Sequence, residues 1–151
     1  MREQTVYLDS SSIVKRYVKE PGSSVVRELY LKTYVGDNVI SYSIWNIGEV
    51  LGALDKARSI GRLTEEAYIT ARRRFVSETR RMVKLGIALV IPVKTKLLKE
   101  SWRLLEKHHM YVADALQIAS AKYIKVAEFL TAEKRVHEIA SDEGLNSRWL
   151  T

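Results

Sequence analysis

Short β-prone segments alternate with longer segments of helical periodicity along the whole chain. Strands are expected near 4–8, 38–41, 87–91, 128–131 and 147–150, and helices near 11–19, 22–34, 44–59, 63–85, 94–108, 112–124 and 133–143. The expected helices are separated or ended by proline and glycine residues, namely Pro21-Gly22, Gly61, Gly86 and Gly144. Strands that are joined by helical crossovers pair in parallel and are covered on both faces. We therefore expect an α/β fold, a three-layer sandwich with a central, mostly parallel sheet flanked by helices.

Length and composition favour one soluble domain over residues 1–151. Apolar residues make up 46% of the 151, and no repeat or linker divides the chain. The chain has no cysteine, which excludes a disulfide framework and a thiolate zinc site and favours a reducing cytoplasm. No apolar run approaches the roughly 18 residues of a membrane span, and residues 1–4 lack the apolar core of a signal peptide. We expect a cytoplasmic protein without membrane contact.

The charge balance is basic. The chain has 25 Lys and Arg against 18 Asp and Glu, a formal net charge of +7. Such an excess attracts a polyanion and is equally compatible with ordinary solubility. Arg73, Arg80 and Lys84 share one ridge of the helix expected at 63–85, and this ridge either binds phosphate backbones or is a solvated face.

Two of the expected strands end in acidic and hydroxyl residues. The first runs directly into Asp9, Ser10, Ser11 and Ser12, and the strand at 128–131 ends in Thr131, two residues before Glu133. Open α/β sheets bind ligands at the carboxyl ends of their parallel strands, so both acids are candidate site residues. Ser and Asp at such points also cap the following helix. The segments alone leave both interpretations open.

Glu49 lies in an expected helix, 44–59, whose first part is almost entirely apolar. The stripe expected to face the core is Ile44, Ile47, Leu51 and Leu54. Glu49 lies on the opposite side, where it is either solvated or partly buried against a group that needs a negative charge. A helix that is apolar on both sides also indicates burial against a partner chain.

Asp114 opens a helix of small residues, expected at 112–124. An acid in the first turn is favoured by the helix dipole, which explains it without any chemistry. Small neighbours such as Ala113 and Ala115 also let the backbone approach another group closely. Together with the two strand-end acids and Glu49, Asp114 can meet the others at one edge of the sheet.

These segments, taken in order, resemble the PIN-domain family and, within it, the VapC-type toxin ribonucleases. The matching segments are 7–22, 41–54, 112–121 and 129–145. The resemblance implies a PIN-like domain that cuts RNA with Mg²⁺ or Mn²⁺. It further implies the toxin of a type II toxin–antitoxin pair, held in check by a small antitoxin protein and assembled as a homodimer.

The resemblance also implies roles for individual residues. The catalytic acids would be Asp9, Glu49, Asp114 and Glu133, with Asp9, Asp114 and Glu133 as metal ligands. Glu133 departs from the pattern, because the family usually has an aspartate after Thr-Ala. Independently of the resemblance, Lys15 and Arg16 follow the Asp9 loop closely and are expected to touch substrate. Ser10 and Thr131 are the other expected substrate contacts, and both hydroxyl residues could instead be simple caps.

The chemistry of the four acids fits such a role. Carboxylates gathered in one site repel each other, so the folded site needs protons or a divalent cation. Hard oxygen ligands favour Mg²⁺ or Mn²⁺ over zinc.

Three other functions compete with this one. A catalytically weak or silent PIN scaffold would only bind RNA or protein partners. A phosphatase with Asp9 as nucleophile would carry a second acid two residues on, where this chain has Ser11. A nucleotide-binding protein would need a phosphate loop or a dinucleotide glycine fingerprint, and the sequence has neither.

Overall fold

The structure of the chain is a computed structural model that describes residues 4–151. The strands are β1 (Gln4–Leu8), β2 (Asn38–Ser43), β3 (Ala88–Ile91), β4 (Glu128–Thr131) and β5 (Ser147–Trp149). The helices are α1 (Ser10–Tyr17), α2 (Ser23–Tyr34), α3 (Ile44–Ser59), α4 (Glu65–Lys84), α5 (Thr95–His108), α6 (Val112–Tyr123) and α7 (Lys134–Asp142). The expected order of strands and helices is confirmed. The expectations for residues 1–3, the start of the domain and of the chain, lie outside the described residues.

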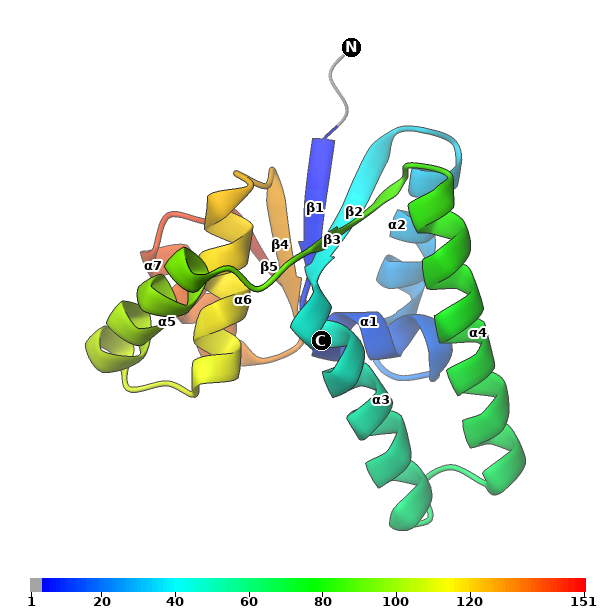
Figure 1. Cartoon of the computed structure of the whole chain (residues 1–151). Coiled ribbons are helices and arrows are strands. Elements are labelled where there is room, and N and C mark those ends of the chain that lie inside the picture. Colours follow the sequence, from blue (N-terminus) through cyan, green and yellow to red (C-terminus); the bar gives the residue numbers. More distant parts are fainter. Residues whose placement is uncertain (1–3) are drawn as a thin grey trace.

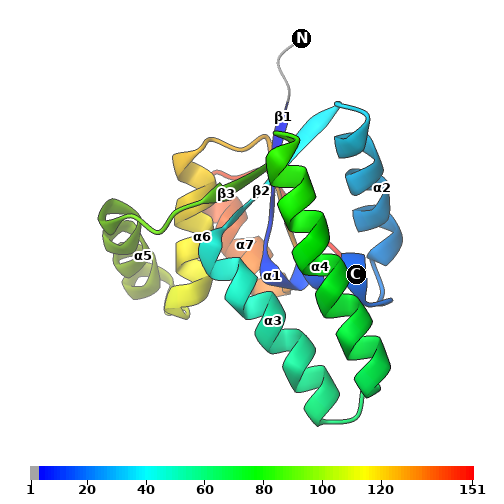
Figure 2. The same cartoon turned by 45° about the vertical axis from the view of Figure 1, so that its right-hand side comes forward.

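All five strands form one sheet in the order β3-β2-β1-β4-β5, and every pair is parallel. The expected α/β sandwich is confirmed, and the sheet is parallel throughout. The chain starts at the central strand, moves outward through β2 to β3, and then returns to the other side of β1 for β4 and β5. Helices α1 to α4 cover one face, and α5 to α7 cover the other (Figures 1 and 2).

The core forms around the central strand because both faces of the sheet are covered. Val6, Tyr7 and Leu8 of β1 are all buried, which is the continuous apolar pattern of a central parallel strand. The ring of Tyr7 stacks on Phe129 of the neighbouring β4, with centroids 5.3 Å apart. This packing fixes β1 against β4 and so sets the relative positions of Asp9 and Thr131, which follow at the two strand ends.

Helix α3 buries only part of the stripe that the sequence predicts. Leu54 is fully buried, and Ile47 and Leu51 are partly buried against the core. Its buried residues are Asn46, Val50 and Leu54, whereas Ile44 is 53% exposed. The prediction for Ile44 is wrong because Ser43 and Asn46 form a capping box that turns Asn46 inward at the start of the helix. The buried face is therefore shifted and contains a polar residue.

Helices α3 and α4 form an antiparallel pair that extends past the carboxyl edge of the sheet (Figure 1). Helix α4 ends in Arg81 and Lys84 and begins with Glu65 and Glu66, a distribution that complements its dipole. None of the helices in residues 4–151 is long and apolar enough to cross a membrane.

Candidate active site

Four acids come from different elements to the carboxyl edge of the sheet. Asp9 is the N-cap of α1, directly after β1, and Glu133 is the N-cap of α7, just after β4. Glu49 lies in α3, which follows β2, and Asp114 lies in the first turn of α6. Because β1 lies between β2 and β4, the chain reverses direction across the sheet here, and such switch points are where open α/β sheets bind ligands.

Asp9 is held rigidly at this point. Its Oδ1 accepts hydrogen bonds from Ser11 Oγ at 2.7 Å and from the Ser12 backbone N–H and Oγ at 2.9 Å each. Its Oδ2 accepts a hydrogen bond from Thr131 Oγ1. Burial raises the pKa of the Asp9 carboxyl group, while these hydrogen bonds act in the opposite direction. Asp9 is thus both the helix cap and a buried acid at the sheet edge, so the two interpretations of the sequence are compatible.

Glu49 faces the same edge through one carboxylate oxygen. Its Oε1 accepts hydrogen bonds from Ser10 Oγ at 2.7 Å, from Asn46 Nδ2 at 3.3 Å and from Gln117 Nε2 at 3.4 Å. The solvated alternative for Glu49 does not hold, since three side chains from α1, α3 and α6 orient this carboxylate. Its place on α3 follows from the inward turn of Asn46, which lies one helical turn before it.

A buried polar network that the sequence analysis did not identify supports Glu49. Tyr7 OH donates to Asn46 Oδ1 at 2.7 Å, and Asn46 Nδ2 donates to Gln117 Oε1 at 2.7 Å. Asn46 is fully buried and Gln117 is 3% exposed, so each amide depends on these partners. The available signal was one amide among the apolar neighbours of each helix, Asn46 in α3 and Gln117 in α6, since a buried amide without a partner is costly.

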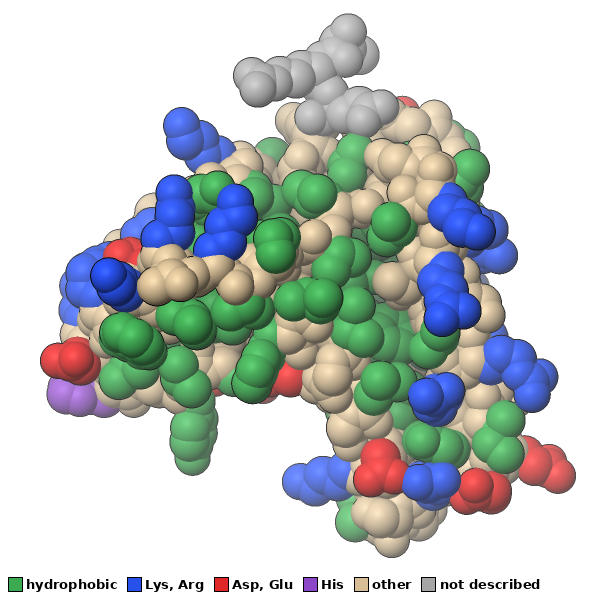
Figure 3. Space-filling view, in the orientation of Figure 1, with side chains coloured by type: hydrophobic (Ala, Val, Ile, Leu, Met, Phe, Trp, Pro, Cys, Tyr) green, Lys and Arg blue, Asp and Glu red, His purple; other side chains and the backbone are tan. Residues whose placement is uncertain are grey.

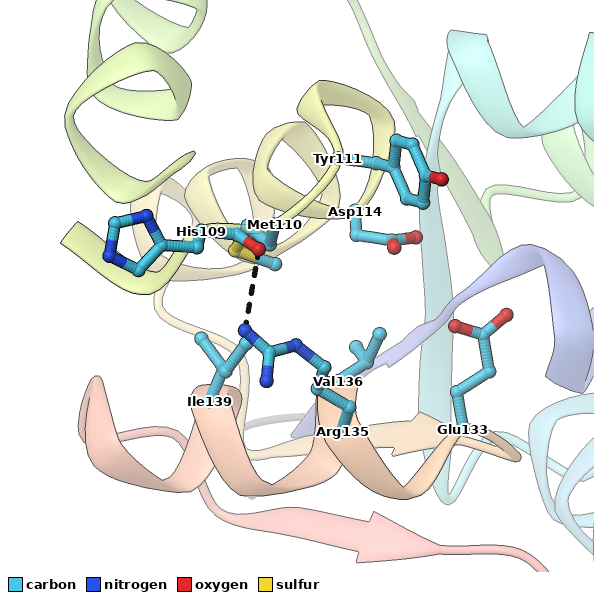
Figure 4. Close-up of a pocket in the computed structure, with 8 residues that line it drawn as sticks. All are labelled: His109, Met110, Tyr111, Asp114, Glu133, Arg135, Val136 and Ile139. Carbon is cyan, nitrogen blue, oxygen red and sulfur yellow. Dashed lines mark hydrogen bonds between the residues drawn. The ribbon is translucent and has the colours of Figure 1, made fainter. Parts of the chain in front are cut away.

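Asp114 and Glu133 differ from the other two acids because they have no internal partner. Among residues 4–151, neither carboxylate receives a hydrogen bond or forms an ion pair. Partial desolvation and the negative charges of Asp9 and Glu49 raise the pKa of Asp114 to about 6. Partial desolvation, followed by repulsion from Asp114, Asp9 and Glu49, raises the pKa of Glu133 to about 7. The two carboxylates turn toward the same space (Figure 4), and this space carries excess negative charge.

A pocket of about 430 Å³ opens beside these two acids. It is lined by His109, Met110, Tyr111, Asp114, Glu133, Arg135, Val136 and Ile139. The lining comes from the turn between α5 and α6 and from one face of α7 (Figure 4). The acidic site therefore continues into a cavity with a mixed apolar and polar lining.

The structure brings only two of the four predicted substrate contacts to the acids. Ser10 and Thr131 lie in the site and donate to carboxylates. Arg16 instead forms a bidentate ion pair with Glu78, in which Nε and Nη2 each donate to one carboxylate oxygen at 2.9 Å. Its guanidinium group also lies over the Tyr30 ring.

Lys15 is also occupied away from the acids. It is buried, and its Nζ lies 3.4 Å from Glu20 Oε1. Lys15 and Arg16 line a separate basic pocket together with Lys19, Arg27 and Arg74. The adjacency of Lys15 and Arg16 to Asp9 in sequence is misleading, because α1 carries their side chains toward α2 and α4.

The donor set is suited to a hard divalent cation. It offers carboxylate and hydroxyl oxygens with no histidine or cysteine, and two of its carboxylates have no internal partner. Within residues 4–151, however, no three acidic or histidine side chains form a preassembled group that could hold a metal ion. The residues thus fit Mg²⁺ or Mn²⁺ by chemistry and by excess negative charge, without a closed cage.

The open parallel sheet, with acids gathered at its switch point, places this protein among the α/β proteins whose site lies at the carboxyl edge of the sheet. Within that class, the chain belongs to the PIN-domain family, whose sequence profile matches residues 6–142. The resemblance seen in the sequence is confirmed at the level of the family. No curated protein sequence matches the chain.

Solved structures show the same fold. The chain is similar to VapC20 of Mycobacterium tuberculosis, a sarcin-ricin loop cleaving toxin, with a TM-score of 0.65 and 16% identity over 93% of this chain and 95% of that one. It is similar to VapBC2 from Rickettsia felis bound to a DNA fragment from its promoter, with a TM-score of 0.62 and 16% identity over 97% and 99%. FitAcB from Neisseria gonorrhoeae gives a TM-score of 0.63 and 16% identity over 94% and 95%.

Proposed function

We propose that this protein is a metal-dependent endoribonuclease and the toxin of a type II toxin–antitoxin pair. The observation that carries the proposal is the pair of unpartnered carboxylates, Asp114 and Glu133, that face one space beside the buried Asp9. Their mutual repulsion gives a divalent cation a reason to bind there. Family membership and the fold shared with VapC20 support the choice of a nuclease.

The four acids would share two tasks. Asp9, Asp114 and Glu133 would hold Mg²⁺ or Mn²⁺, which supplies positive charge to stabilise an in-line displacement at a phosphodiester. Glu49 would add a further negative charge to the site, where Ser10, Asn46 and Gln117 fix its carboxylate. Thr131 positions Asp9 through its hydroxyl group and accepts the Glu133 backbone N–H at 3.0 Å. One hydroxyl group thereby links two of the proposed ligands.

The geometry of Asp9 argues against a phosphatase. Both of its carboxylate oxygens are engaged by hydrogen bonds, and one of the donors is Ser11, which occupies the position where a second acid would be expected. A carboxylate whose charge is stabilised by four donors is a weak nucleophile. A metal-ligand role does not require Asp9 to attack the substrate.

A small antitoxin protein is the proposed inhibitor. Its proposed binding site is a groove between α1 and α3. The groove has a volume of about 370 Å³ and is lined by Val14, Val18, Lys19, Glu20, Ala53, Leu54, Ala57, Arg62 and Leu63. Its apolar floor between α1 and α3 suits the apolar face of a partner helix, and charged side chains lie at the rim.

A homodimer is the proposed assembly. Ile44 and Trp45 of α3 and Leu89 of the edge strand β3 are about half exposed, at 53%, 50% and 46%. Hydrophobic side chains gather across the middle of the face in Figure 3, while Lys and Arg follow α4 at its margin. Extended apolar surfaces of this kind mark protein–protein contacts.

Cleavage and metal binding test the proposal together. Purified protein should cut single-stranded RNA in Mn²⁺ and lose this activity in chelator, and calorimetric titration should detect Mn²⁺ binding. The silent scaffold is the second candidate, because no preassembled ligand group exists among residues 4–151. RNA binding without Mn²⁺ binding or cleavage would establish the scaffold and reject the nuclease.

A further inference from the structure

The pocket beside Asp114 and Glu133 has features that the four acids do not explain. It lies between the α5–α6 turn, which contributes His109, Met110 and Tyr111, and the face of α7 that carries Val136 and Ile139. Its volume of about 430 Å³ falls within the ordinary range of small-ligand sites. The acids occupy one end, so most of the pocket is available to a group attached to whatever binds at the acids.

The walls of the pocket combine an apolar base with an exposed aromatic ring. Val136 and Ile139 of α7 are almost completely buried, at 4% and 5% exposure, and with Met110 they form an apolar base. Tyr111 at the N-cap of α6 is 83% exposed, the highest value among the exposed large hydrophobic side chains. In Figure 4 its ring stands beside the Asp114 carboxylate at the pocket rim. A planar ring next to an apolar base can stack on a flat ligand.

Arg135 supplies the polar side of the pocket and fixes its shape. Its Nη2 donates to the backbone carbonyls of both His108 and His109. These bonds hold the turn in which His109 takes a positive φ of 56°, a conformation that is uncommon for a residue other than glycine. The turn leads directly into Tyr111, so Arg135 pre-positions the ring. Among residues 4–151, Nε and Nη1 of Arg135 have no partner and remain available as donors.

We propose that this pocket is a subsite for one unstacked nucleobase of an RNA strand, next to the phosphodiester that would bind a cation at the four acids, and that Arg135 favours guanine. The proposal rests on the proposed ribonuclease function and adds to it a preference for the base. Single-stranded RNA is commonly read by aromatic stacking combined with hydrogen bonds to the base edges. A free arginine N–H can donate to the O6 acceptor of guanine, whereas adenine presents a donor in place of O6.

Stacking can be tested by walking a fluorescent base along a short RNA. A set of single-stranded hexanucleotides, each with one 2-aminopurine, is mixed with protein in Mg²⁺ in a stopped-flow instrument. Fluorescence is recorded before cleavage, and the products of the same mixture are separated afterwards. We expect quenching at one position only. Tyr111→Ala should weaken binding of that RNA by roughly tenfold or more, and Tyr111→Phe should retain most of it.

A matched control separates this ring from any exposed aromatic side chain. Trp102 is 49% exposed on α5 and does not line the pocket, so Trp102→Ala should leave the quenching unchanged. Quenching that survives Tyr111→Ala, or that is absent at every position, would overturn the subsite. Quenching without any cleavage would reject the ribonuclease and leave the subsite standing, whereas cleavage without quenching would do the opposite.

The preference for guanine has its own test. Unlabelled hexanucleotides that differ only at the quenched position compete with the labelled RNA, and the guanine version should bind roughly tenfold better than the adenine version. Arg135→Met removes every donor of this side chain, so it should remove this difference. Equal competition by guanine and adenine with the parent protein would overturn the role of Arg135.

Discussion

Asp9 and Asp114 carry the same charge but are held in different ways. Asp9 accepts hydrogen bonds from Ser11, Ser12 and Thr131, so an Asp9→Asn substitution replaces an acceptor with a donor in a buried network. The resulting loss of activity would mix lost charge with local misfolding. Asp114 has no such partners among residues 4–151, so Asp114→Asn removes the charge without breaking an internal contact.

The pair Asp114 and Glu133 should make stability depend on pH when no metal is present. Both pKa values are raised in the folded state, to about 6 and about 7, so the folded protein binds protons that the unfolded chain has already released. Unfolding free energy should therefore fall as pH rises from 5 to 8 in chelator. Glu133 is exposed, so we expect a loss of only about 1–2 kcal/mol.

Denaturant unfolding at several pH values measures this effect, and Glu133→Gln should make the dependence shallower. Glu78 and Glu143 do not interfere, because their lowered pKa values affect stability only in more acidic solution. An unchanged pH dependence in Glu133→Gln would show that its carboxylate is not under repulsion.

Variants of Glu133 also separate the effect of side-chain charge from the effect of side-chain length. If it binds metal directly, Glu133→Gln should weaken Mn²⁺ binding and slow cleavage, while Glu133→Asp should largely keep both. If it serves only as the helix N-cap, aspartate and glutamine variants should bind Mn²⁺ alike. Their stability should then differ from the parent by about 1 kcal/mol. Calorimetric titration at a single pH distinguishes the two outcomes, and equal affinities in all three proteins would remove Glu133 from the metal site.

At the scale of elements, Asn46 connects three of them. It accepts from Tyr7 of β1 and donates to Gln117 of α6, while its side chain completes the capping box with Ser43 at the start of α3. Asn46→Ala leaves Tyr7 OH and Gln117 without this partner, and we expect it to lower the unfolding free energy by about 1–3 kcal/mol. Because Glu49 loses one of its orienting donors, kcat should also fall while KM changes little.

Ser59→Ala provides a matched control for Asn46→Ala. Ser59 Oγ makes one exposed hydrogen bond to the Lys56 carbonyl at the far end of the same helix. Its removal should change unfolding free energy by less than about 0.5 kcal/mol and leave kcat intact. If Asn46→Ala behaves like Ser59→Ala in denaturant unfolding and cleavage assays, the network does not position Glu49.

The elements could be predicted from sequence because hydrophobic period and glycine breaks are local signals. Gly86, for example, has a φ of +74° directly after α4, where a helix end was expected. The inward turn of Asn46 was not predictable in the same way, since it depends on Tyr7 and Gln117, residues distant in sequence.

The candidate site also follows partly from local sequence signals and partly from contacts between residues distant in sequence. Asp9 and Thr131 could be predicted as neighbours because parallel strand ends converge. The ion pair between Arg16 and Glu78 could not be predicted, because it depends on how α1 packs against α4.

At the scale of the whole molecule, the exposed apolar surface of α3 and β3 predicts a homodimer. Trp45 is 50% exposed on α3, so Trp45→Glu places a charge on the proposed interface without disturbing the core. Analytical ultracentrifugation should show a dimer of the parent at micromolar concentration and a monomer of the variant. A monomeric parent would leave this surface unexplained by self-association, and a dimeric variant would place the interface elsewhere.

The proposed function requires that acids at one edge of a parallel sheet hold a divalent cation and cut RNA. Mn²⁺-dependent cleavage of single-stranded RNA by Asp114→Asn, compared with cleavage by Asp142→Asn, decides whether they do. Asp142 is an exposed acid at the end of α7, so its variant makes the same chemical change outside the site. We predict that Asp114→Asn loses cleavage at least a hundredfold while remaining folded, and that Asp142→Asn cuts like the parent. Full cleavage by a folded Asp114→Asn protein would show that these acids are not the catalytic site.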